Sequence, residues 1–281
     1  MAMIQALNLL NPQESDISVR TLTFNDGEPH IWLDSIDRKA YIHVLCRVAN
    51  PNDLFILVQV GDILNRQGVR WALTITYLMG MRMDRVISFG EAFSLKVVAD
   101  AINSLQADSV RICEPHSNRT TELIERCAES SLVRIPDLKP YIAVFPDGGA
   151  KVRYSSCCYR NGSELCCQKR RDPNTGQIVS LEIEEKAECV VERHPGKPFL
   201  VLDDLCDGGG TFARVAKILE ERWPDRERHI YVTHMVNPKG IEVLAQHYHH
   251  VTFTNSYRDW QNEQLPDNVT VNIIDNPINH E

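Results

Sequence analysis

The sequence lacks a long apolar run and an excess of basic residues, and each absence argues against a class of protein. No stretch of the 281 residues is apolar for long enough to cross a bilayer. Residues 1–10 also lack the basic-then-apolar pattern of a secretory leader. The formal net charge of −8 argues against a protein that binds a nucleic-acid backbone. We therefore expect a cytoplasmic protein that binds neither nucleic acid nor membrane.

The cysteines also lack the spacing of a disulfide framework or a zinc site. There are nine, an odd number, and four of them form the adjacent pairs Cys157-Cys158 and Cys166-Cys167. Zinc sites usually separate paired cysteines by two or more residues, and secreted frameworks use even sets of spaced cysteines. We interpret the cysteines as reduced thiols and the pairs as small buried side chains.

Strand-like apolar runs alternate with helical patterns along the whole chain. This alternation, with 43% hydrophobic residues, predicts an α/β protein of two domains with mainly parallel sheets flanked by helices. The predicted strands are Ala40–Cys46, Phe55–Val60, Ala72–Tyr77, Ser109–Cys113, Tyr141–Phe145, Leu165–Gln168, Phe199–Leu202, Ile230–Thr233 and His250–Thr254. The predicted helices are Asp62–Gln67, Phe93–Ser104, Thr120–Glu129, Ala150–Cys158, Phe212–Glu221 and Gly240–Tyr248.

A domain boundary is predicted in the connection Ser131–Pro140, which contains two prolines and shows no clear period. The predicted domains are residues 1–137 and 138–281. Within the second, the acidic segment Ile178–Val191 alternates at its start and predicts an exposed hairpin or a flap.

The most informative stretch begins at Phe199. A buried parallel strand is predicted to run into Asp203 and Asp204, and the sequence Asp-Gly-Gly-Gly-Thr from Asp207 then leads into a helix. Backbone N–H groups of such a glycine turn can converge on a phosphate at the helix N-terminus. The carboxylates can hold sugar hydroxyls or a metal. The stretch therefore predicts a sugar-phosphate site.

Three further polar clusters follow predicted strands: Glu114-Pro-His116, Asp147-Gly-Gly and Lys169–Arg171. Each alone has an ordinary explanation, as a loop histidine, a helix cap and a solvated basic run. Ligand sites of open parallel sheets lie at the carboxyl ends of the strands. Carboxylates, an imidazole and cationic groups at one such edge suit magnesium–nucleotide chemistry, because phosphoryl transfer depends on alignment and charge neutralisation.

Taken in order, these motifs resemble the ribose-phosphate pyrophosphokinase family, also called phosphoribosyl diphosphate (PRPP) synthetases. The Asp203–Thr211 segment looks like a PRPP motif, which alone would also fit type I phosphoribosyltransferases. The rest resembles the synthetases, and the resemblance covers about residues 20 to 275. The matching segments are Phe24–Glu28, Tyr77–Arg85, Ser94–Asp100, Glu114–His116, Pro146–Gly149 and Lys169–Arg171.

The resemblance implies two type I phosphoribosyltransferase-like domains, the first with the ATP loops and the second with the PRPP loop and a catalytic flap. The implied reaction moves the β,γ-diphosphoryl group of Mg-ATP to the 1-hydroxyl of ribose 5-phosphate, giving PRPP and AMP. It also implies a dimer or hexamer, in which a neighbouring subunit completes the ATP site.

The resemblance also implies roles for individual residues. It assigns Mg²⁺ to His116 and Asp147, and ATP to Arg82, Asp84, His116, Asp26 and Glu28, the last two across a subunit contact. It assigns catalysis to Lys169 and Arg171 of the flap, with His116. It assigns binding of the sugar phosphate to Asp203, Asp204, Asp207, Gly208, Gly209, Gly210 and Thr211.

The chain departs from the family pattern at several positions. Met83 replaces a glutamine, a polar segment from Ser117 to Thr121 replaces a glycine-rich one, and Gly208 replaces a threonine of the phosphate loop. The smaller residue opens the loop to an acceptor with a second nucleotide beyond its 5-phosphate. One alternative is therefore the same chemistry on ADP-ribose for NAD rebuilding, with Arg119 on the extra phosphate. The other explanation is that Gly208 is a neutral substitution, because the loop binds the 5-phosphate mainly through backbone N–H groups.

Two other functions remain as alternatives. A type I phosphoribosyltransferase would share the PRPP loop, but it would not need the nucleotide motifs at Phe24–Glu28 and Arg82–Arg85. A catalytically silent associated subunit would be expected to lose the basic flap, yet Lys169 and Arg171 are present. Both therefore fit the sequence less well than a pyrophosphokinase.

Overall fold

The computed structural model divides the chain into two compact units. The first comprises residues 1–133 together with the segment from Ile274, and the second comprises residues 134–273. The structure describes residues 3–130, 132–154, 162–171, 178–184 and 186–274, but not the side chains of 169–171 and 178–179. The division falls at Val133 rather than at 137, and Ile274 groups with the first unit rather than with the second domain.

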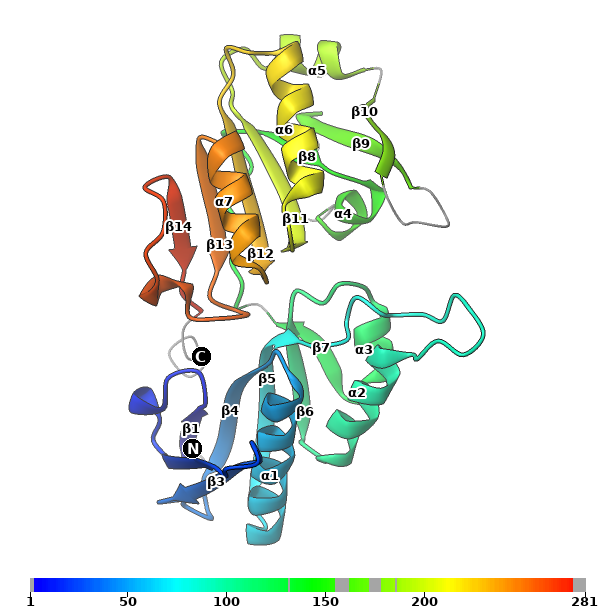
Figure 1. Ribbon diagram of the computed structural model, residues 1–281. Coiled ribbons are helices and arrows are strands. Elements are labelled where there is room, and N and C mark those ends of the chain that lie inside the picture. Colours follow the sequence, from blue (N-terminus) through cyan, green and yellow to red (C-terminus); the bar gives the residue numbers. More distant parts are fainter. Residues whose placement is uncertain (1–2, 131, 155–161, 172–177, 185, 275–281) are drawn as a thin grey trace. The chain divides into compact units, whose positions relative to one another are not determined.

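The first unit is built on a five-stranded parallel sheet whose spatial order follows the order of its strands along the chain. Helices flank this sheet, and a separate antiparallel pair, β2 (Ser18–Thr23) and β3 (Pro29–Asp34), lies beside it (Figure 1). The strands are β1 (Ile4–Asn8), β4 (Tyr41–Val48), β5 (Arg70–Leu78), β6 (Ser109–Cys113) and β7 (Cys127–Ser130). The helices are η1 (Pro12–Glu14), α1 (Pro51–Gln67), α2 (Ser94–Ser104) and α3 (Arg119–Leu123).

The predicted strand Phe55–Val60 is wrong, because this segment lies inside α1. The helix begins with a capping box in which the Asn50 side chain accepts from the backbone N–H of Asp53, and the Asp53 side chain accepts in return. Pro51 occupies the first helical turn, where its missing N–H costs nothing. Leu57, Val60, Gly61 and Leu64 then form the buried face, which is a helical spacing.

The second unit is built on a seven-stranded sheet in the order β10-β9-β8-β11-β12-β13-β14, parallel except for the β9–β10 pair. Its strands are β8 (Ile142–Phe145), β9 (Glu164–Arg171), β10 (Ile178–Ile183), β11 (Phe199–Cys206), β12 (Arg228–Met235), β13 (His250–Thr254) and β14 (Val269–Asn272). Its helices are α4 (Gly148–Arg153), α5 (Ala187–Arg193), α6 (Gly210–Arg222), α7 (Pro238–His247) and η2 (Trp260–Asn262). The predicted α/β class with mainly parallel sheets is confirmed.

Three local predictions need correction. The helix predicted at Thr120–Glu129 covers only α3 and is followed by the strand β7. The acidic segment Ile178–Val191 does start as half of an antiparallel pair, but it continues into helix α5. The helix predicted at Ala150–Cys158 is α4, which ends at Arg153, and Cys157 and Cys158 lie outside the described residues.

The other cysteine pair agrees with its interpretation. Cys166 is partly buried, Cys167 is buried, and both are free thiols. Burial also raises the pKa of the Cys113 and Cys206 thiols to about 12, so neither is a reactive thiolate at neutral pH. Among the helices that the structure describes, none has the length and apolar character needed to cross a bilayer.

The order of strands locates the ligand edge of the second unit. From β8 the chain goes to β9 on one side and later to β11 on the other, so the direction of winding reverses at β8. Open α/β sheets bind ligands at the carboxyl ends of strands beside such a reversal. Buried Val201, Val215, Leu219 and Phe253 pack in the core of this unit and help to hold the edge rigid.

Candidate active site

The predicted phosphate loop joins the end of β11 to the start of α6. Gly209 adopts a left-handed backbone with φ of 75°, and a Cβ there would lie 2.9 Å from Cγ1 of Val243. The fold therefore requires glycine at this position. Added Cβ atoms at Gly208 and Gly210 would meet nothing within 4 Å. The loop is therefore tightly packed at Gly209 and has free space beside Gly208 and Gly210. It lies at the N-terminus of α6, where backbone N–H groups can bind an anion.

The first turn of helix α7 packs against this loop at Asp207. Gly240 lies so close that a Cβ there would be 2.1 Å from the backbone oxygen of Asp207. Asn237, the N-cap of α7, donates from Nδ2 to Oδ1 of Asp207 at 3.1 Å. These contacts set the position of the Asp207 backbone and side chain. Neither residue was predicted, because the contact joins segments far apart in the sequence.

Gly240→Ala is expected to destabilise the protein by roughly 1–3 kcal/mol, since the new methyl group collides with backbone. Calorimetry should show the lower melting temperature. Gly208→Ala is the matched control, because its methyl group points into open space and its stability should stay within about 0.5 kcal/mol of the wild type. Equal melting temperatures for the two variants would contradict the proposed support of the loop by α7.

The predicted acidic pair is held by an arginine. Arg153, at the end of α4, donates from Nη1 to Oδ1 of Asp204 at 2.7 Å and to Oδ1 of Asp203 at 3.2 Å. The Asp204 backbone N–H also donates to Oδ1 of Asp203 at 3.0 Å. Burial, and then the neighbouring Asp204 carboxylate, raise the pKa of Asp203 well above its usual range, against the opposing charge of Arg153. Sequence reasoning missed Arg153, because it contacts the pair on β11 from a separate element, helix α4.

Asp147 begins α4 in the same part of the second unit. Its Oδ1 accepts from the backbone N–H of Ala150 at 3.0 Å, so it is a helix cap. It also contributes to the raised pKa of Asp203. Asp147, Asp203 and Asp204 thus give this edge three carboxyl groups, the ligand type that Mg²⁺ prefers. Arg153 already binds two of them, Asp203 and Asp204, so a magnesium ion held by Asp147 and His116 stays a prediction.

The basic residues Lys169, Arg170 and Arg171 form the end of β9. Their backbone is paired antiparallel with β10, where Leu181 lies opposite Lys169 and Ile178 opposite Arg171. Because β9 pairs with β8, this basic strand end belongs to the same sheet as Asp147 and the acidic pair.

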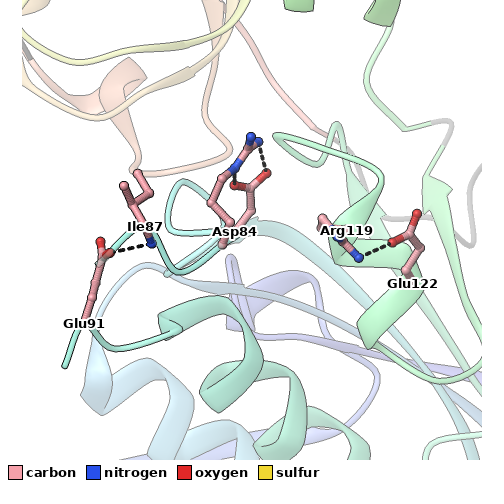
Figure 2. Close-up of polar contacts among 6 residues, drawn as sticks. Asp84, Ile87, Glu91, Arg119 and Glu122 are labelled. Atoms are coloured by element: carbon pink, nitrogen blue, oxygen red, sulfur yellow. Dashed lines mark hydrogen bonds and ion pairs between the residues drawn. The ribbon is translucent and has the colours of Figure 1, made fainter. Parts of the chain in front are cut away.

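In the first unit, two loops meet at the carboxyl ends of neighbouring strands β5 and β6. The Arg85 guanidinium binds the buried Asp84 carboxylate through two contacts, Nε to Oδ1 at 2.7 Å and Nη2 to Oδ2 at 3.1 Å (Figure 2). Arg85 lowers the pKa of Asp84, and Ser117 and the His116 ring lower it further. The predicted residues Asp84 and His116 therefore belong to neighbouring loops at the same end of the first unit's sheet.

Other contacts shape the same loops. The backbone N–H of Ile87 donates to Oε2 of Glu91 at 2.8 Å (Figure 2). The backbone N–H of Ser88 donates to the same oxygen at 3.0 Å, and both bonds lower the pKa of Glu91. Arg119 is paired with Glu122 at 3.2 Å across one turn of α3 (Figure 2). Exposed pairs of this kind contribute about 0.2–1 kcal/mol.

The remaining predicted ATP residues lie at exposed positions of the first unit. Asp26 and Glu28 form the turn between β2 and β3, where Oδ1 of Asp26 accepts from the Glu28 backbone N–H at 3.1 Å. Arg82 is exposed in the loop after β5. The predicted residues are thus divided between the units. Arg82, Asp84, His116, Asp26 and Glu28 belong to the first, and Asp147, Lys169, Arg171 and the Asp203–Thr211 segment belong to the second.

Comparisons with known proteins agree with the motifs. No family model matches the chain. A ribose-phosphate pyrophosphokinase of Pyrococcus furiosus is 27% identical over 253 residues, covering 85% of this chain and 86% of that protein. The protein of that name from Sulfurisphaera tokodaii is 24% identical over 277 residues, covering 92% of this chain and 85% of its own length.

The fold has a match among solved structures. The crystal structure of phosphoribosylpyrophosphate synthetase from Mycobacterium smegmatis matches with a TM-score of 0.76 at 20% identity, covering 97% of this chain and 95% of that one. The architecture of two mainly parallel sheets flanked by helices is therefore that of a type I phosphoribosyltransferase-like fold. Together with the curated relatives, this match confirms the resemblance that the motifs carry: along most of its length the chain is similar to the ribose-phosphate pyrophosphokinases (PRPP synthetases).

Proposed function

We propose that the protein is a pyrophosphokinase that transfers the β,γ-diphosphoryl group of Mg-ATP to the 1-hydroxyl of ribose 5-phosphate, giving PRPP and AMP. One observation carries the proposal: the Asp203–Asp204 pair lies in the carboxyl-terminal half of β11 and the open glycine loop follows the strand directly, beside the winding reversal of the sheet. That combination provides hydrogen-bond acceptors for a sugar and donors for its phosphate.

In this proposal the second unit binds the acceptor. The carboxylates of Asp203 and Asp204 accept hydrogen bonds from the ribose hydroxyls, and Arg153 keeps both carboxylates in place. The loop from Asp207 to Thr211 binds the 5-phosphate through its backbone N–H groups. Since Asn237 and Gly240 of α7 hold Asp207 in position, binding of the 5-phosphate by the loop depends on α7. Orientation of the 1-hydroxyl is then set by groups on both sides of the sugar.

The ATP side is assigned to the first unit. We propose that Arg82, Asp84 and His116 contact the nucleotide, with Asp26 and Glu28 near an adenine bound by a neighbouring subunit. A magnesium ion, with His116 and Asp147 as its protein ligands, would neutralise phosphate charge when bound. Lys169 and Arg171 supply positive charge where negative charge develops on the transferred diphosphoryl group. The flap that carries them excludes water, which would otherwise compete as acceptor.

A second acceptor is favoured by one observation at the phosphate loop. Gly208 leaves open space where the family has a threonine side chain, since a Cβ there would meet nothing within 4 Å. ADP-ribose carries the same free 1-hydroxyl as ribose 5-phosphate, with a second nucleotide beyond the phosphate. We propose it as the alternative acceptor, which would place the enzyme in NAD rebuilding.

Gly208→Thr tests this alternative. The added side chain fits the fold, so stability should hold while the loop narrows around the 5-substituent. We expect the ratio of kcat/KM for ADP-ribose to that for ribose 5-phosphate to fall about tenfold or more, within the range of steric discrimination by one small group. AMP release with each acceptor measures the ratio. An unchanged ratio, or wild-type turnover with ribose 5-phosphate alone, would dismiss ADP-ribose.

A further inference from the structure

A group of side chains of the metal-ligand type lies at the amino ends of strands β12 and β13. Glu227, His229 and His250 each offer one ligand atom, and these atoms all lie within 4.8 Å of one another. Oε2 of Glu227 is 3.0 Å from Nε2 of His229. The rings of His229 and His250 meet edge to face, with centroids 4.5 Å apart.

The sheet itself holds these three residues in place. His229 of β12 and His250 of β13 are direct partners in the parallel register. Glu227 comes two residues before His229, and side chains two apart along a strand share a face. The backbone of Glu227 already belongs to the hydrogen-bond ladder between β11 and β12, because the Phe199 N–H donates to the backbone carbonyl oxygen of Glu227 at 2.9 Å. Two neighbouring strands therefore fix the ligand positions before any ion binds.

Two imidazoles and a carboxylate form the donor set of a first-row transition metal, Zn²⁺ above all, rather than of Mg²⁺. With bonds of about 2.0–2.2 Å, tetrahedral ligand atoms lie about 3.3–3.6 Å apart, so Glu227 and His229, whose ligand atoms are 3.0 Å apart, need to separate only slightly to hold an ion. Glu227 and His250 are exposed, so water can complete the coordination.

The group is separate from the candidate active site. It lies at the amino ends of β12 and β13, whereas the phosphate loop lies at the carboxyl end of β11. Strand β12 has 8 residues, which corresponds to about 25 Å at 3.3 Å per residue. We propose that Glu227, His229 and His250 form a transition-metal site that binds Zn²⁺ and ties the starts of β12 and β13 together.

The test uses the full-length protein without a histidine tag, stripped of metal. Isothermal titration with ZnCl₂ should give one site, and His250→Gln and Glu227→Gln should each weaken it at least about tenfold. His247→Gln is the matched control, because His247 is a nearby histidine outside the group. Binding of Zn²⁺ should also raise the melting temperature of the wild type and of H247Q, but not of H250Q.

Titration with CoCl₂ identifies the ligand type. A tetrahedral spectrum without thiolate charge-transfer bands is expected, and it should disappear in His250→Gln. AMP release with Mg-ATP should be the same for H250Q and the wild type, since His250 lies outside the candidate active site. Thiolate bands, absence of Zn²⁺ binding, or equal Zn²⁺ affinity for the wild type, E227Q and H250Q would each overturn the proposal.

Discussion

Lys169→Ala is expected to reduce kcat by about 10³-fold while Mg-ATP binding survives. A cation that stabilises the charge of a transferring phosphoryl group acts mainly in the transition state, and its loss typically costs 10³–10⁵-fold in kcat. The nucleotide residues proposed here all lie in the first unit, whereas Lys169 lies near the end of β9 in the second. Steady-state AMP release gives kcat, and titration calorimetry gives the ATP affinity.

The neighbouring Arg170→Ala is the control for Lys169. It removes one positive charge from the same strand end, but the family resemblance gives Arg170 no role. We expect its kcat to stay within a few-fold of the wild type. Turnover that persists in K169A, or an equal loss in both variants, would show that the catalytic assignment of β9 is wrong.

Asp203→Asn is expected to reduce activity and to raise stability. The carboxylate is proposed to accept a hydrogen bond from a sugar hydroxyl, and loss of a hydrogen bond to a charged group costs about 1.5–3 kcal/mol, or roughly 10–150-fold in kcat/KM. At the same time asparagine removes the repulsion between two buried carboxylates. A gain of roughly 0.5–2 kcal/mol in stability at neutral pH is therefore expected, at the expense of activity.

The stability difference should depend on pH in a defined direction. The pKa of Asp203 is raised in the folded protein, so between about pH 4, where an unfolded aspartate titrates, and that raised pKa the folded state binds more protons. The wild type therefore loses stability as pH rises through this window, and Asp203→Asn does not.

Melting temperatures of the wild type and D203N at pH 5 and pH 8 measure this dependence. The advantage of D203N should be larger at pH 8. Asp225→Asn, an exposed position in the loop before β12, should show neither effect. An advantage that shrinks as pH rises would contradict the raised pKa, and full activity of D203N would contradict the role of the carboxylate.

The sequence predicted the sheets well where strands are short apolar runs bounded by polar residues. It failed at Phe55–Val60, where an apolar run is as compatible with a buried helix face as with a strand. The deciding signal was local: Asn50, Pro51 and Asp53 form an N-terminal cap that only a helix uses.

The candidate site was predictable in its acidic pair and glycine loop, because these groups are contiguous in sequence. Arg153, Asn237 and Gly240 were missed, since each acts on the loop or the pair from a different element. Gly240 carried a weak signal, as glycine near the start of a helix pattern has no propensity reason to be there. A close backbone approach supplies the reason, and only the structure reveals it.

The central claim is diphosphoryl transfer, and the products of one reaction test it. The protein is incubated with Mg-ATP and either ribose 5-phosphate or ADP-ribose, and the nucleotide and the sugar product are followed by ³¹P NMR. The account predicts AMP, formed in equal amounts with a sugar that carries a new diphosphate on its 1-hydroxyl. Formation of ADP, or no acceptor-dependent release of AMP with either sugar, would contradict it.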